Sequence, residues 1–104
     1  MDVTFSTATL AALCNSERRL AQRWGPQLGR MIGCRLLDLA AVDAARLERL
    51  PTVEVSTDGG ETIIDFGGEI VVRGVIYSSD VEGRQGRGNT DRIVITRLEV
   101  KGSD

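Results

Sequence analysis

The spacing of apolar residues changes at Leu50-Pro51, and this change limits the possible folds more than any other feature of the chain. Before it, apolar side chains recur at helical intervals, and after Pro26 they occupy positions 28, 31, 32, 36, 39 and 40. This spacing predicts an amphipathic helix. After it, apolar and polar residues alternate, as in Val53-Glu54-Val55-Ser56, which predicts β-strands. The order of the two patterns predicts an α+β domain in which helices precede a run of strands.

Local signals predict where the helices of the first half begin and end. Asp2–Phe5 alternates polar and apolar residues and predicts a first strand, and Ser6-Thr7 is suited to cap the helix that follows. Asn15-Ser16 interrupts the apolar spacing, so we expect this helix to kink or restart there. Trp24-Gly25-Pro26 predicts a tight corner, because proline suits the first position of the next helix. Two helices joined by so short a turn should pack antiparallel.

Two pairs of residues predict contacts inside this helical hairpin. Gly29 and Gly33 lie four apart in the second helix. Since glycine costs about 1 kcal/mol inside a helix, their presence predicts close backbone contact with the first helix. Cys14 and Cys34 are about equally far from Gly25, so the hairpin can bring them near each other, and in the cytosol both are expected to be reduced, buried thiols.

Turn signals divide the second half into four strands. Asp43 is suited to cap a last helical turn that ends at Leu50-Pro51. Asp58-Gly59-Gly60 predicts a hairpin, and Gly67-Gly68 predicts the next turn. Ile70–Tyr77 is expected to be a long central strand with a bulge or bend at Gly74. A loop over residues 78–91 and a last strand over Arg92–Val100 should follow it. The order β-α-α-β-β-β-β predicts one domain over residues 1–104, with a helical hairpin packed on a curved antiparallel sheet.

Composition and charge narrow the chemistry that is available. The chain has no histidine and two cysteines, which argues against a structural zinc site and against histidine-based catalysis. We expect no metal or cofactor. No apolar run is long enough to cross a membrane and the start does not read as a signal peptide, so a cytoplasmic location is expected. The net charge is −2, but residues 17–35 hold five arginines and one glutamate, a local charge of +4. A basic patch confined to the helices is therefore expected.

Several stretches, taken in order, resemble one family. They are Val3-Thr4-Phe5-Ser6-Thr7 with the helix after it, Trp24-Gly25, Arg35-Leu36-Leu37-Asp38-Leu39-Ala40-Ala41, Leu50-Pro51, and the last strand from Arg92 to Glu99. This arrangement is similar to that of RelE/HigB-type toxins of type II toxin–antitoxin systems, the "killer protein" family. The resemblance implies a RelE-like fold and a ribosome-dependent mRNA endoribonuclease, or mRNA interferase, which cuts mRNA with the RNA 2′-OH as nucleophile. It also implies three partners: the ribosome, mRNA and a cognate antitoxin, often a helix-turn-helix protein.

Candidate site residues follow from this resemblance and from the charge pattern. Arg73 is the first candidate for a catalytic group, because a permanently charged guanidinium can stabilise the developing charge on a phosphate. Tyr77 and Lys101 are second candidates. The ring of Tyr77 could stack on an RNA base, and Lys101 could act as a general base. The arginines that could contact RNA phosphates are Arg18, Arg19, Arg23, Arg30, Arg35, Arg84 and Arg87. A solvated surface explains these arginines equally well, and Trp24 is expected to anchor the helix corner in the core.

The sequence departs from the family pattern at customary active-site positions. The stretch after Leu50-Pro51 has no histidine or basic residue, Arg73 is out of register with the usual arginine, and the chain ends in Lys101-Gly102-Ser103-Asp104. These departures leave a second hypothesis open, in which the same fold is catalytically degenerate. It would then bind an antitoxin or another protein without cleaving RNA.

Overall fold

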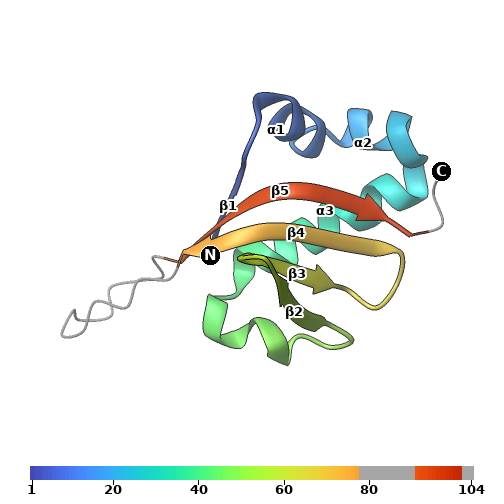
Figure 1. The fold of residues 1–104 in the computed structure, drawn as a ribbon. Coiled ribbons are helices and arrows are strands. Elements are labelled where there is room, and N and C mark those ends of the chain that lie inside the picture. Colours follow the sequence, from blue (N-terminus) through green and yellow to red (C-terminus); the bar gives the residue numbers. More distant parts are fainter. Residues whose placement is uncertain (78–90, 102–104) are drawn as a thin grey trace.

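A mixed sheet and a layer of helices make up the computed structural model, which describes residues 1–77 and 91–101. The helices are α1 (Ala8–Cys14), α2 (Glu17–Trp24), α3 (Pro26–Ala41) and the short 3₁₀ helix η1 (Ala44–Arg49). The strands are β1 (Asp2–Phe5), β2 (Glu54–Asp58), β3 (Glu61–Asp65), β4 (Ile70–Tyr77) and β5 (Arg92–Val100). Figure 1 shows α3 crossing one face of the sheet, with α1 and α2 on the side of β1 and β5. The expected α+β class and element order are confirmed, with the first helix divided in two.

The sheet has the strand order β1-β5-β4-β3-β2. Strands β2 to β5 pair antiparallel, but β1 pairs parallel with β5, with Asp2 opposite Arg92 and Phe5 opposite Ile95. The prediction of a wholly antiparallel sheet is therefore wrong at this edge. Parallel neighbours need a long connection between them, and nearly the whole chain lies between these two strands.

Side-chain caps begin the helices where the sequence predicts them. The hydroxyl oxygens of Thr7 and Ser16 accept hydrogen bonds from the backbone N–H groups of Leu10 and Arg19. The carboxylate of Asp43 accepts in the same way from the N–H of Arg46. Each cap satisfies a backbone donor that has no partner within the helix. The break between α1 and α2 at Asn15-Ser16 is thus confirmed.

The corner between α2 and α3 depends on two glycines. Gly25 has a φ of +98°, a backbone angle that side-chain-bearing residues rarely adopt. A Cβ on Gly29 would lie 2.8 Å from the backbone nitrogen of Ala21, so the two helices touch there, as predicted. A Cβ on Gly33 would have no atom within 4 Å among the described parts of the chain, so the contact predicted at this second glycine is wrong. The helices diverge between the two positions.

The hydrophobic core lies between the helices and one face of the sheet. Its fully buried side chains come from alternate positions on the strands and from one stripe on each helix: Leu20, Ile32, Leu39, Leu47, Ile64, Ile70, Val72, Ile93 and Ile95. The irregularity predicted at Gly74 is present as a shift in strand register between Arg73 and Gly74, but the extra residue, Thr96, is in β5. A Cβ on Gly74 would lie 2.6 Å from the carbonyl oxygen of Val94. Since strand side chains alternate between faces, Arg73 and its neighbours of the same parity lie on the face away from the helices.

Candidate functional site on the outer face of the sheet

Arg73 lies on the outer face of the sheet among three carboxylates. Its Nη1 is 3.8 Å from Oδ2 of Asp58 and 3.9 Å from Oε1 of Glu61. Its Nε is 3.7 Å from Oε1 of Glu99. The β2–β3 hairpin supplies the first two acids and β5 supplies the third. We call these four residues the Arg73 cluster.

Strand register explains why the cluster forms. Arg73 pairs with Ile63 in β3 and with Arg97 in β5, so its side chain lies between the two neighbouring strands. Glu61 and Glu99 lie two residues beyond these partners, on the same face. Asp58 pairs with Glu61 at the end of the hairpin and adds a second acid there.

The cluster has more negative than positive charge. One guanidinium faces three carboxylates, and the side chain of Arg73 is only 27% exposed. Thr96 donates a hydrogen bond to Oε2 of Glu61 and holds that carboxylate in place. Among the described residues, none accepts a hydrogen bond from the buried Nε of Arg73. The arginine is thus held by charge attraction, and the surrounding field repels anions.

Lys101 is tied to the turn between β3 and β4. Its Nζ donates to Oδ2 of Asp65 at 2.8 Å, and the N–H of Gly67 donates to Oδ1 of the same carboxylate at 2.9 Å. These two hydrogen bonds hold the pKa of Asp65 below its usual value, with the bond from Lys101 as the larger cause. The Nζ of Lys101, the candidate general base, is thus engaged with Asp65.

Tyr77 lies near the far end of the same face. Its side chain is exposed, and the guanidinium of Arg92 lies 4.9 Å from the centre of the ring. Tyr77 is four residues from Arg73 along β4, a separation of about 13 Å. Lys101 follows Val100, which pairs with Ile70 at the opposite end of β4. The three candidate catalytic residues are therefore spread along the strand and do not converge on one point.

Five of the seven arginines expected to contact RNA lie on helices α2 and α3. Arg18, Arg19, Arg23 and Arg30 are exposed on α2 and α3. Arg35 is half-buried and its Nε is 3.3 Å from Oδ2 of Asp38. Arg84 and Arg87 lie outside the described residues. The helix layer covers the core face of the sheet, whereas the Arg73 cluster lies on the outer face. Of the helix arginines, Arg23 reaches the edge of that face, where it lines a hollow together with Glu99 of the cluster.

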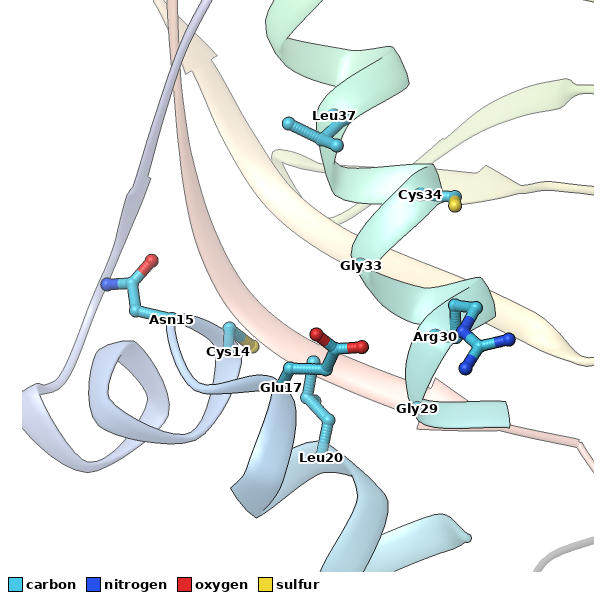
Figure 2. A pocket seen from close by; sticks show the side chains of 9 residues that line it. All are labelled: Cys14, Asn15, Glu17, Leu20, Gly29, Arg30, Gly33, Cys34 and Leu37. Atoms are coloured by element: carbon cyan, nitrogen blue, oxygen red, sulfur yellow. The ribbon is translucent and has the colours of Figure 1, made fainter. Parts of the chain in front are cut away.

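The two cysteines line one hollow between the α1–α2 junction and α3. Figure 2 shows Cys14 at the end of α1 and Cys34 on α3, with Gly33 and Leu37 beside the latter. The hollow has a volume of about 260 Å³. Both thiols are free, but only Cys14 is buried; Cys34 is exposed, so the expectation of two buried thiols is wrong there. Burial raises the pKa of the Cys14 thiol to about 11. Within residues 1–77 and 91–101, no three histidine, cysteine or acidic side chains are placed to hold a metal ion together.

Sequence reasoning selected Arg73, Tyr77 and Lys101 but missed the acids around them. In the sequence, the three acids look like ordinary strand and hairpin residues. The pairing of β2 with β3 and of β4 with β5 is what brings Asp58, Glu61 and Glu99 close to Arg73. Alternation along β2 and β3 gives one signal, since it turns Asp58 and Glu61 away from the buried Ile64. It does not predict Glu99, which shares the parity of the buried Ile93 and Ile95 and faces outward only because the pairing of β5 shifts opposite Arg73 and Gly74.

No family model, curated protein or solved structure matches this chain. Across the part of the chain that the structure describes, none of the helices is both long and apolar enough to cross a membrane. Fold and site together therefore define a small α+β domain with a charged outer sheet face and an arginine-bearing helical layer.

Proposed function

We propose that this chain is a RelE/HigB-type domain of a toxin–antitoxin system that binds a partner protein, its cognate antitoxin, and does not cleave RNA. The observation that carries the proposal is the enclosure of Arg73 by Asp58, Glu61 and Glu99 at 3.7–3.9 Å. In an mRNA interferase, the corresponding guanidinium would have to face the phosphate that is attacked.

Electrostatics disfavour an RNA phosphate at the Arg73 cluster. A phosphate that approached Arg73 would come within about 4 Å of a carboxylate. At an effective dielectric constant of about 20, that repulsion costs about 4 kcal/mol for each pair of like charges. Three acids surround Arg73 and the neighbouring Arg97 adds one more cation, already paired with Glu99, so the carboxylates still outnumber the arginines. The cluster is better explained as a structural one, in which Arg73 of β4 links the β2–β3 hairpin to β5 through ion pairs.

The spread of the other candidate groups supports the same conclusion. General acid–base catalysis needs a proton acceptor within hydrogen-bond reach of the attacking hydroxyl. Tyr77 lies about 13 Å along the strand from Arg73, and Lys101 is hydrogen-bonded to Asp65. The chain has no histidine to take their place.

A second candidate function is the ribosome-dependent mRNA endoribonuclease that the family resemblance implies. The exposed arginines of α2 and α3 favour it, because cationic side chains on one helical layer suit contact with ribosomal RNA phosphates. Under either proposal, the chain would act in the cytoplasm.

A cleavage assay on purified ribosomes that translate a defined mRNA separates the two functions. We expect no new mRNA ends with the unaltered chain, measured by primer extension, and no growth arrest when it is expressed alone. Cleavage by the unaltered chain would overturn the proposal, and its loss in Arg73→Ala would make Arg73 a catalytic residue. Calorimetric titration with the protein encoded by the neighbouring gene tests the binding role directly. We expect tight binding that Arg73→Ala leaves in place.

A further inference from the structure

The last residues of β5 leave part of the sheet edge unpaired. β1 pairs only with Arg92–Ile95 of β5, and the N–H of Ser6 makes the last hydrogen bond of this edge, to the carbonyl of Ile95. Along residues 97–100, no described strand lies on the β1 side of β5. An unpaired edge presents backbone donors and acceptors that can pair with an added strand. Figure 1 shows this end of β5 close to the corner between α2 and α3.

Two hollows meet at this place, and Trp24 lines both of them. One, of about 380 Å³, lies between α2 and the end of β5, and its charged lining consists of Arg23, Arg97, Glu99 and Lys101. The other, of about 420 Å³, has a mixed lining in which Trp24, Leu28 and Met31 lie beside the polar Gln27 and Glu69. We call this surface the Trp24 corner. It combines an open strand edge, a hollow that contains apolar side chains and a group of cations.

The cations of the Trp24 corner are exposed and make only surface interactions, so a ligand can reach them. The Arg97 side chain is 67% exposed and its Nε is 3.4 Å from Oε2 of Glu99. Arg23 is exposed, with its guanidinium 4.9 Å from the centre of the Trp24 ring. Lys101 is half-exposed beside Asp65. Exposed ion pairs are worth about 1 kcal/mol or less, so a carboxylate from a partner competes for these groups at small cost.

We infer that the Trp24 corner binds an extended acidic segment of a partner protein. The segment would add as a strand to residues 97–100 of β5, with an apolar side chain beside Trp24 and carboxylates on Arg23 and Arg97. Main-chain pairing supplies affinity in such strand addition, and the side-chain hollows supply specificity. This inference rests on the proposed binding function and names the chemistry of its partner.

The same charges favour a peptide over a nucleic acid. Glu99 lies among the cations of one hollow, and Glu69 lines the other. A strand of RNA would bring a phosphate past every nucleotide and would meet these acids. A peptide with two or three carboxylates can place them on Arg23 and Arg97 and turn other side chains toward Glu69.

Trp24 is the only tryptophan of the chain and gives the test its signal. The probe is a pool of short N-acetylated peptides in which one leucine, isoleucine or phenylalanine is followed by aspartates and glutamates. We expect saturable changes in Trp24 fluorescence and in its indole N–H resonance when the full chain is titrated. Peptides with methylated backbone nitrogens should bind at least about fivefold more weakly, because they cannot complete the strand pairing.

Matched variants locate the binding. Arg23→Ala and Arg97→Ala should each weaken binding at least about fivefold. Arg46→Ala removes an exposed arginine of η1 and should leave the affinity unchanged. Thermal unfolding of each variant checks that it is folded.

Three results would overturn the inference: no binding of the acidic pool, equal binding by Arg97→Ala and the unaltered chain, or tighter binding of a single-stranded oligouridylate than of the peptides. None of them depends on the ribosome assay. The chain could cleave no mRNA and bind the protein encoded by the neighbouring gene through a surface other than the Trp24 corner. In that case the proposed function stands and this inference alone fails.

Discussion

Gly29 of α3 lies against the backbone of Ala21 in α2, so closely that a Cβ on Gly29 would be 2.8 Å from the Ala21 nitrogen. The nearest atoms are backbone atoms, which cannot rotate away as the end of a side chain can. Gly33, one helical turn further on, has open space in the same direction, and the two glycines therefore form a matched pair.

Gly29→Ala should lower the free energy of unfolding by about 1–3 kcal/mol, because the helices must separate to admit the methyl group. Gly33→Ala should raise it by about 0.5–1 kcal/mol, since alanine is the better helix former and nothing obstructs it. Urea denaturation followed by circular dichroism measures both. Equal stability of the two variants would show that the contact at Gly29 is not tight.

Arg73→Met should destabilise the chain, because it removes the cation that lies among Asp58, Glu61 and Glu99 and leaves only Arg97, paired with Glu99, to offset the three carboxylates. The expected loss is about 1–3 kcal/mol for a charge that is mostly buried. Arg97→Met removes an arginine from the adjacent, largely exposed position, and should cost less than about 0.5 kcal/mol. Urea titrations of both variants give the comparison, and similar losses would contradict the structural role of the Arg73 cluster.

The pair of Asp65 and Lys101 should make stability depend on pH at the acidic end. The pKa of Asp65 is lowered in the folded chain from 3.8, so the folded state binds fewer protons than the unfolded one in this range. The stabilisation is therefore present above a pH of about 4 and is lost as the pH falls through the folded-state pKa. Because the pair is partly exposed, we expect at most about 1 kcal/mol.

Asp65→Asn measures this contribution, since asparagine keeps the shape of the side chain and removes the charge. Its free energy of unfolding should fall below that of the unaltered chain at neutral pH, and the two values should converge in acid. A difference of the same size at both pH values would assign the effect to packing.

Cys14 should give a second pH dependence, at the alkaline end. Burial raises its pKa to about 11, whereas an unfolded thiol ionises near the ordinary value of 9.0. The folded state thus retains its proton longer, and the stability that comes from burying the neutral thiol is lost as the pH rises from about 9 to about 11. Urea unfolding over this range should show a decline in stability that Cys14→Ala lacks.

The two thiols also differ in exposure, which alkylation can measure. Cys34 is exposed and Cys14 is buried. Iodoacetamide at neutral pH should modify Cys34 first, and Cys14 only as the chain opens, because the thiolate is the reacting species. Equal rates, followed by mass spectrometry, would contradict the burial of Cys14.

Much of the local structure could be predicted from the sequence, because local chemistry decides it. Thr7, Ser16 and Asp43 cap helices through hydrogen bonds that span three residues. Gly59 and Gly60 both have positive φ in the two-residue hairpin turn, as the sequence signal predicts. The ends of β4 and β5 match the predicted strands, since the change from helical to alternating spacing can be read within each segment.

The candidate site could be predicted only in part, because its residues come together through contacts between distant segments of the chain. Arg73 was identified, but its three acids come from β2, β3 and β5, and only strand pairing brings them together. The parallel pairing of Asp2 with Arg92 joins residues that are far apart in the chain, and no local spacing encodes it.

The sequence by itself determined which residues form helices and strands, where these elements begin and end, and which face of each is apolar. Hydrogen bonds and side-chain periodicity over a few residues are enough for that. Only the tertiary structure decided that Gly29 touches the neighbouring helix while Gly33 does not, that Arg73 is surrounded by acids, and that β5 keeps an open edge beside Trp24. These features depend on the distances between distant segments, and packing of the whole chain sets those distances.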